Sequence, residues 1–215
     1  MATAVLLAAF VGAWPFLLAF PPSAVLFLAV TALFAPAAGA FAGGIGLGRA
    51  KSLALLPPAA WMILLGLAQS LGARALPNPV GAAAAWSALY VLGWGLGSLL
   101  DRQRRPSPGL AFVRGGRVLL LTVLVSGLPF LRLLLPSLQI APEIAARLLD
   151  VSPLSLVVEC GGVDWLRQPL VYEWSGGADI GPLLRTPYSA VLAAPGALVV
   201  GCALIWIGRH RSMDA

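Results

Sequence analysis

VGAAAAWSALYVLGWGLGSLLDRQRRPSPGLAFVRGGR, residues 80–117, joins the two kinds of sequence from which this chain is built. Residues 80–100 are apolar or small, and their number matches the roughly 20 residues that a helix needs to cross the hydrocarbon core of a bilayer. Residues 101–117 carry five arginines and form the most basic loop of the chain. Because short loops rich in Lys and Arg stay on the cytoplasmic side, the stretch predicts a transmembrane helix that ends at the cytoplasmic face.

The composition extends this prediction to the whole chain. Of the 215 residues, 60% are hydrophobic and only 10% are charged, whereas about a quarter of the residues in a globular domain are charged. This length accommodates at most about six or seven spans and leaves no room for a large soluble domain. We therefore expect an all-α, polytopic integral membrane protein. The strong preference for Arg over Lys, with abundant Ala, Gly and Pro, indicates GC-rich coding and a bacterial source.

Six apolar segments are long enough to be spans. They cover residues 3–20, 23–47, 52–71, 80–100, 118–135 and 188–208. The first is interpreted as a retained span and not as a cleaved signal peptide, because no basic residue precedes its apolar run. Pro21 and Pro22 predict a tight hairpin between the first two spans, and Pro36 should kink the second.

The basic residues fix the expected orientation of these spans. With both termini in the cytoplasm, the outer short loop carries a single basic residue, Arg74. The inner segments then carry Arg49, Lys51, Arg102, Arg104, Arg105, Arg114, Arg117, Arg209 and Arg211. The prediction is a multi-pass protein of the bacterial cytoplasmic (inner) membrane. It has a five-helix region (1–136), an extracytoplasmic segment (137–187), and a sixth helix with a basic cytoplasmic tail (188–215).

The extracytoplasmic segment carries six of the eight acidic residues of the chain. Within it, residues 142–149 place apolar side chains at helical spacing with charges at the rim, which predicts an amphipathic helix in the outer membrane interface. Residues 151–162 are mostly apolar and end in Gly161 and Gly162, so this part is expected to dip into the membrane and return.

Several side chains near the outer face are candidates for contact with a partner or a substrate. Charges lie beside aromatic rings in this segment, as they do in interfacial belts and in protein contact sites; we favour the belt for Trp165 and a partner contact for Trp174. Arg132 either extends to the interface or faces an anion or an acidic partner residue in a cavity. The candidates are Arg132, Glu159, Asp164, Trp165, Arg167 and Trp174.

Two pairs of glycines have the spacing at which membrane helices approach closely. Gly39 with Gly43, and Gly93 with Gly97, are each four residues apart in a predicted span. Small residues at this spacing let two helix backbones come into contact, so we expect these four glycines to pack helices together. Whether the packing lies within one subunit or against a partner stays open.

The residues that the spans lack restrict the chemistry. The single histidine, His210, lies in the polar tail, so paired haem ligands and a Ser-His catalytic pair are not expected within the membrane. No Asp, Glu or Lys lies well inside a span, which argues against ion-coupled transport. Glu159 and Asp164 have no nucleophile or metal ligand beside them, so we expect neither a cofactor nor a metal, and no catalytic role.

The function favoured by this pattern is a non-catalytic subunit of a larger membrane assembly. Six spans, both termini inside, and a long, partly apolar outer segment between spans five and six are similar to the outline of ABC-2 type exporter permeases. That resemblance implies a transport complex, although the short inner loop at residues 48–51 departs from the coupling helix that such permeases commonly carry.

Two alternatives stay open. One is a structural or accessory subunit around an energy-converting or enzymatic core, and the other is a membrane enzyme that acts on lipid-linked substrates through its outer acids. The expected partners are membrane lipid and other membrane subunits. Nucleic acid is not expected, because the basic residues flank apolar segments.

Overall fold

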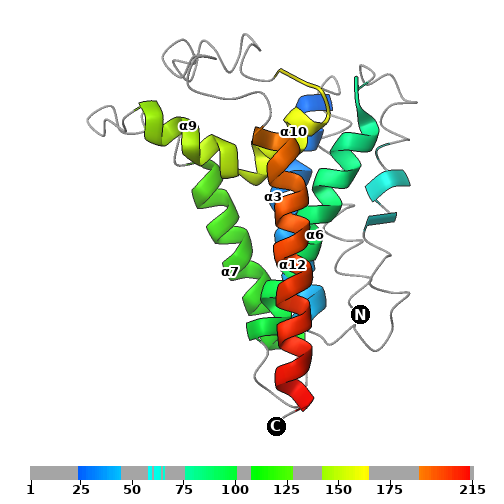
Figure 1. Cartoon of the computed structure of the whole chain (residues 1–215), viewed down its shortest axis with the longest axis vertical. Coiled ribbons are helices and arrows are strands. Elements are labelled where there is room, and N and C mark those ends of the chain that lie inside the picture. The colour runs from blue at the N-terminus through cyan, green and yellow to red at the C-terminus, as the bar shows by residue number, and fades with distance from the viewer. Residues whose placement is uncertain are drawn as a thin grey trace.

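The computed structural model describes residues 24–44, 58–59, 61–63, 65, 76–100, 108–127, 142–164 and 189–213. Every regular element in these ranges is an α-helix, and no strand occurs in them. The main helices are α3 (Ala24–Gly44), α6 (Pro79–Leu100), α7 (Pro108–Gly127), α9 (Pro142–Val151), α10 (Pro153–Cys160) and α12 (Ser189–Met213), as labelled in Figure 1. The predicted all-helical class is confirmed for this part of the chain.

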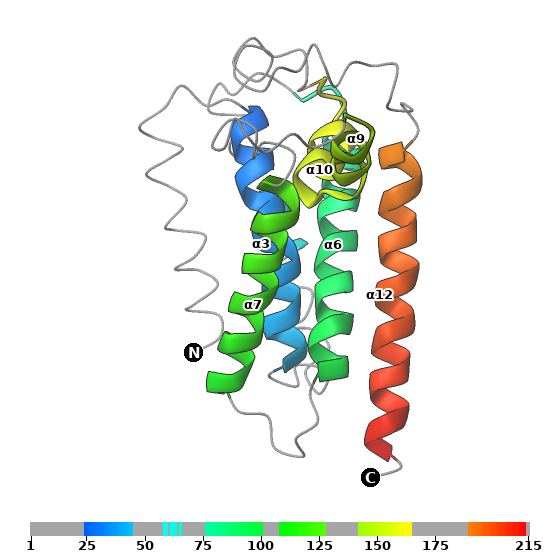
Figure 2. The same cartoon turned by 90° about the vertical axis from the view of Figure 1, so that its left-hand side faces the viewer.

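The four long helices lie side by side in the order α7, α3, α6, α12 (Figure 2). Helices α9 and α10, which we call the cap, lie at one end of this row, and α9 crosses the end of α7 at a steep angle (Figure 1). Helices α3, α6 and α12 begin at this cap end, whereas α7 begins at the opposite end. We call the opposite end the basic end, because in the sequence Arg49 and Lys51 follow α3, and Arg102, Arg104 and Arg105 follow α6.

The sequence located α3 and α6 well. Helix α6 begins at Pro79, one residue before the predicted start, and ends at Leu100 as predicted. Asn78 explains the start, since its side-chain Oδ1 accepts a hydrogen bond of 2.9 Å from the backbone N–H of Gly81. Proline is favoured at the next position, where no N–H is needed. The predicted first span and most of the third (52–71) lie outside the described residues.

The predicted start of the fifth span is wrong, because α7 begins at Pro108 and not at residue 118. Gly115 and Gly116, which belong to the predicted basic loop, lie within the helix. A Cβ atom on Gly115 would lie 3.3 Å from the carbonyl oxygen of Ala37, so this glycine allows α7 to lie close to α3. Arg114 and Arg117 are consequently helical residues of α7, and the predicted loop loses its second half.

The apolar stretch of α12 ends at Gly208, where the sequence places the end of the sixth span, but the helix itself continues to Met213. The expected polar tail around His210 is therefore helical. The His210 ring meets the edge of the Trp206 ring one turn earlier, with centroids 4.4 Å apart. Basic residues are favourable in the last turns of a helix, where the carbonyl groups carry partial negative charge.

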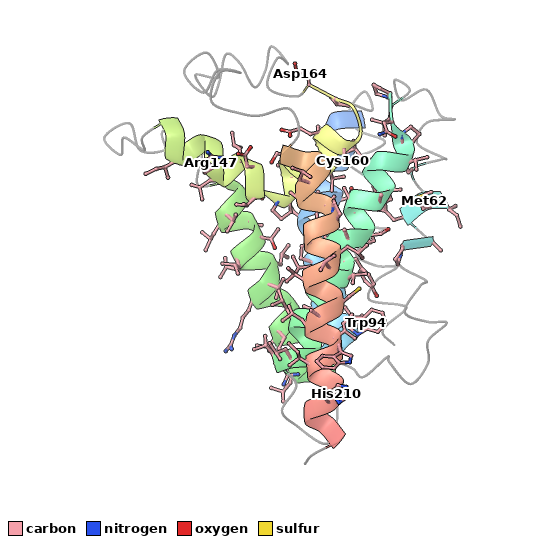
Figure 3. The ribbon with its side chains drawn as sticks, in the orientation of Figure 1. Met62, Trp94, Arg147, Cys160, Asp164 and His210 are labelled. Carbon is pink, nitrogen blue, oxygen red and sulfur yellow. The ribbon has the colours of Figure 1, made fainter. Side chains whose placement is uncertain are left out.

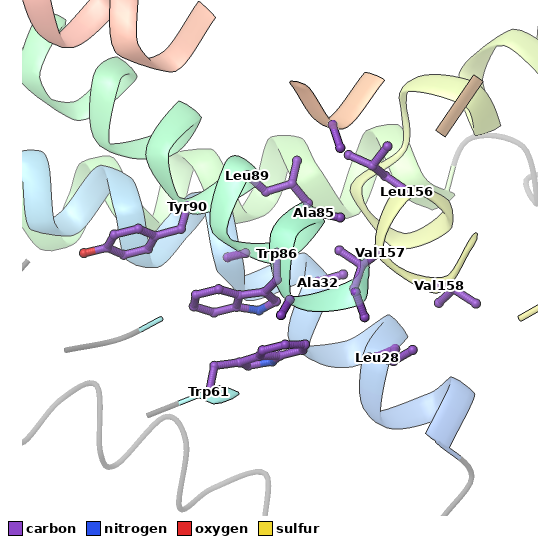
Figure 4. Packing of buried hydrophobic residues seen from close by; sticks show 14 of the residues in the cluster. Leu28, Ala32, Trp61, Ala85, Trp86, Leu89, Tyr90, Leu156, Val157 and Val158 are labelled. Carbon is purple, nitrogen blue, oxygen red and sulfur yellow. The ribbon is translucent and has the colours of Figure 1, made fainter. Parts of the chain in front are cut away.

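The core of the described residues joins the row to the cap. Helix α10 contributes Val157 and Val158, both 0% exposed, to the cluster that contains Leu28 of α3 and Trp86 of α6 (Figure 4). Leu149 at the end of α9 is also fully buried. The cap is therefore packed into the end of the row.

Two of the described helices are long and apolar enough to cross a membrane by length and composition, Pro79–Leu100 and Gly109–Gly127. Two shorter stretches, Leu28–Gly44 and Leu192–Gly208, are also apolar. The two outer helices of the row expose large apolar side chains along their length. On α7 these include Phe112, Leu120, Leu121 and Leu124, and on α12 they include Leu192, Val199 and Trp206.

Candidate functional site

The contact between α3 and α6 is made by backbone lying directly on backbone. A Cβ atom on Gly93 of α6 would collide with the carbonyl group of Pro36 in α3, only 2.6 Å from its carbon. A Cβ atom on Gly97 would lie 2.9 Å from the carbonyl carbon of Ala40. Only glycine allows such an approach, which brings the two helix axes closer than side chains would permit.

The same contact uses both candidate glycines of α3. A Cβ atom on Gly39 would collide with the carbonyl oxygen of Tyr90, and one on Gly43 would lie 2.9 Å from the backbone N of Ser98. The structure thus brings the four candidate glycines together in one interface within the chain. Helix α12 is held in a similar way, since a Cβ atom on Gly95 would lie 2.6 Å from the carbonyl oxygen of Gly201. Gly95 and Gly201 were not among the glycines predicted to pack helices together.

A ladder of aromatic rings runs along α6. The rings of Trp61 and Trp86 are stacked with centroids 5.3 Å apart, and the Trp86 and Tyr90 rings are stacked at 5.9 Å. Tyr90 meets Trp94 edge to face at 6.2 Å. The signal for this ladder is present in the sequence, because three of the rings recur every four residues and therefore share one face of the helix.

The polar atoms of the ladder differ in their pairing. The indole N–H of Trp86 donates a hydrogen bond of 3.1 Å to the carbonyl oxygen of Thr31 in α3. The Tyr90 hydroxyl is buried and has no hydrogen-bond partner in the described part of the chain. The ladder therefore fixes the α3–α6 contact by packing and by one hydrogen bond.

One hydrogen bond between two buried serines connects the cap to α7, and a third buried serine is bonded within the cap. The Ser152 hydroxyl, in the bend between α9 and α10, donates a hydrogen bond of 3.0 Å to the Ser126 hydroxyl near the end of α7. The Ser155 hydroxyl donates to the carbonyl oxygen of Leu149. These bonds satisfy the polar groups of the bend inside an apolar environment, where an unpaired hydroxyl would cost about 1–3 kcal/mol.

The end of α10 is tied to the start of α6. The backbone N–H of Asn78 donates a hydrogen bond of 2.9 Å to the carbonyl oxygen of Gly161. Gly162 adopts a positive φ of 77°, which glycine accommodates without strain, and a Cβ atom on it would lie 2.9 Å from the Cβ of Pro77. The turn ends α10, and Val163 beyond it still packs against the core.

Glu159, Cys160 and Asp164 lie around that turn, at the cap end of the molecule (Figure 3). Glu159 and Cys160 are half-buried in the last turn of α10, and Asp164 is exposed beyond it. Burial, and to a lesser degree the neighbouring Glu159 carboxylate, raise the pKa of the Cys160 thiol. The candidates Arg132, Trp165, Arg167 and Trp174 lie outside the described residues.

The raised pKa of Cys160 predicts slow alkylation. In a Cys202→Ser variant, iodoacetamide should modify native Cys160 more slowly at pH 8 than the denatured chain, because only the thiolate reacts and less of it forms. The pH at which the alkylation rate rises should also be higher for native Cys160 than for Cys160 in the denatured chain. Glu159→Gln should reduce this difference without removing it, since burial is the larger cause. Identical native and denatured pH profiles would contradict this result.

The arrangement offers no evident catalytic centre among the residues described. No three His, Cys, Asp or Glu side chains gather there in a way that could hold a metal ion. The polar groups that are brought together are serines bonded to one another and to backbone carbonyls. What the geometry provides is a tightly packed helix layer with a fitted cap. No family model, curated protein or solved structure matches this chain.

Proposed function

We propose that this chain is a non-catalytic integral membrane subunit of a larger assembly, with a transport complex of the permease-like outline as the first candidate. The observation that carries the proposal is the difference between the two sides of α12. Its inner side packs against α6 at Gly201. Its outer side is exposed and combines apolar residues with small ones, Gly196, Cys202 and Ala203.

The outer side of α12 suits another membrane helix. Gly196 has no atom within 4 Å of the position of an added Cβ atom, so its small size is not required by packing within this chain. Small residues on an exposed apolar helix face allow a partner helix to approach. Both outer helices expose large apolar side chains, but on α7 these occupy most of the exposed positions, with Gly116 among them, and such a surface suits lipid acyl chains.

The proposed membrane arrangement has six spans, with the basic end in the cytoplasm. The directions of the described helices support it, because α3, α6 and α12 run toward the basic end and α7 runs away from it. Since α3 ends at the basic end and α6 begins at the cap end, the scheme requires a crossing between them, where the sequence predicts the span 52–71. The cap then lies at the outer interface. Ile144 and Val151 of α9 are exposed there, and Arg147 pairs with Asp150 at 3.7 Å.

Copurification tests the subunit proposal. The tagged full chain should be extracted from its membrane in a mild detergent, purified at low salt and examined by native mass spectrometry. An ATPase among the retained proteins is the result expected for a transport complex, whereas a cofactor-bearing complex would favour the accessory role. A stable chain that purifies alone would contradict both.

The role of α12 predicts a selective loss of partners. Gly196→Leu should leave the fold intact, because nothing lies within 4 Å of the new Cβ atom, but it should reduce the yield of retained partners at least about tenfold by blocking close helix contact. Gly116→Leu on α7 is the matched control, since that glycine is equally open, and it should retain them. Loss of partners from both variants, or from neither, would refute an α12 contact.

A further inference from the structure

Arg117 occupies an unusual place on α7. It is exposed, and its neighbours on the same helix face are exposed apolar residues at positions −4, +3, +4 and +7. These neighbours are Val113, Leu120, Leu121 and Leu124, with exposures of 48%, 61%, 58% and 52%. A cation thus stands within an outward-facing apolar stripe of a helix that is long enough to span a bilayer.

The depth of Arg117 limits what can neutralise its charge. It is the tenth residue of α7, so its Cα atom lies about 13 Å from the start of the helix at a rise of 1.5 Å per residue. Helical side chains lean toward the helix N-terminus, which in α7 is the basic end. The Arg117 guanidinium therefore extends toward the membrane surface at the basic end, where lipid phosphates lie.

Arg114 adds a second guanidinium one turn closer to that surface. It is half-buried, and one of its terminal nitrogens would lie 3.7 Å from a Cβ atom added to Gly44 at the end of α3. Residues three apart are neighbours on a helix surface, so Arg114 and Arg117 present adjacent donors. Guanidinium groups form strong, charge-assisted hydrogen bonds with phosphate oxygens.

We propose that Arg114 and Arg117 bind the phosphate of an anionic phospholipid in the leaflet at the basic end, with an acyl chain along the apolar stripe of α7. This proposal rests on the proposed membrane insertion. The alternative occupant, a partner helix with an acidic residue, fits less well, because close helix contacts use small residues and this stripe is bulky.

The test compares lipids bound to the full chain after purification in detergent. Native mass spectrometry should detect phosphatidylglycerol on the wild-type protein in preference to phosphatidylcholine supplied at equal concentration. Arg117→Gln should weaken phosphatidylglycerol binding about fivefold, the factor that corresponds to about 1 kcal/mol for one basic residue near an anionic surface. Arg117→Lys should retain most of the preference. Arg147→Gln, which removes an exposed arginine from α9 in the cap, is the matched control and should bind as the wild type does.

A second measurement requires no variant. A phosphatidylglycerol analogue with a diazirine in its acyl chain should form adducts on wild-type α7, at peptides that contain residues 112–124. Adducts found only on α12 would overturn the proposal, as would unchanged lipid binding in Arg117→Gln. Displacement of the lipid by millimolar inorganic phosphate would identify free phosphate as the ligand instead. Loss of a copurifying protein from Arg117→Gln, with lipid binding unchanged, would identify a protein partner at this face.

Failure of the lipid proposal is distinguishable from failure of membrane insertion. Extraction of the native membranes with alkaline carbonate tests insertion alone. A chain that stays in the carbonate-washed membrane yet shows no preference for phosphatidylglycerol would refute only the lipid site.

Discussion

Gly93→Ala is expected to be among the most destabilising single changes in this protein, although it adds only one methyl group. The new Cβ atom would meet the backbone of Pro36 at 2.6–2.7 Å, and backbone atoms, unlike a flexible side chain, cannot rotate away. Helices α3 and α6 would have to separate along their contact. We expect a loss of about 2–3 kcal/mol, the upper part of the range for overpacked cores. Thermal unfolding in detergent, followed by circular dichroism, measures it.

The matched control for this change is Gly116→Ala, which should change the stability in the opposite direction. Gly116 also lies inside a helix, but no atom lies within 4 Å of its added Cβ position. Gly116→Ala should therefore stabilise the protein slightly, by about 0.5–1 kcal/mol, because alanine loses less backbone entropy in a helix. Equal unfolding temperatures for the two variants would contradict the close approach of α3 and α6.

Trp86→Ala should have an effect of similar or greater size for a different reason. The Trp86 ring is 1% exposed and lies between the rings of Trp61 and Tyr90, so its removal leaves a cavity in the aromatic ladder. Truncations of buried tryptophan typically cost about 3–5 kcal/mol. Denaturant unfolding of the purified protein, compared with the wild type, measures the loss.

Two further variants separate packing from hydrogen bonding in the ladder. Trp86→Phe keeps a stacked ring but removes the N–H that donates to the carbonyl of Thr31. The lost hydrogen bond should lower the free energy of unfolding by about 1 kcal/mol, in addition to the effect of the smaller ring. Trp206→Ala removes a ring that is 63% exposed and should change stability little. A loss for Trp206→Ala as large as that for Trp86→Ala would show that the ladder has no special role.

The ends of a helix were predicted best where the length of the apolar segment and the residues that flank it indicate the same ends. Helix α6 has an apolar length that fits one span, and it is bounded by Asn78 and Pro79 at one end and by a basic run at the other. Helix α7 was misplaced, because its first ten residues contain two arginines and were assigned to the basic loop. The role of Gly115 becomes visible only in the structure, where the α3 backbone lies against it.

Contacts between distant segments were less accessible from the sequence. The spacing of Gly39, Gly43, Gly93 and Gly97 marked them as packing residues, but no rule of spacing says that the two pairs meet each other. The hydrogen bond between Ser126 and Ser152 joins residues 26 positions apart, and a serine beside a glycine or a proline carries no distinguishing pattern. Likewise, Trp61 stacks on Trp86 from a separate segment of the chain, outside α6.

The common direction of α3, α6 and α12 has an electrostatic consequence. Peptide dipoles in each helix amount to about half a positive charge at its start and half a negative charge at its end, and three helices that begin together add these charges instead of cancelling them. Asp150 and Glu159 lie in the cap, at the end where these three helices begin, and Asp164 follows α10, while basic residues follow the negative ends of α3 and α6. The side-chain charges that are expected to orient the protein in its membrane thus also offset the mutual repulsion of its aligned helices.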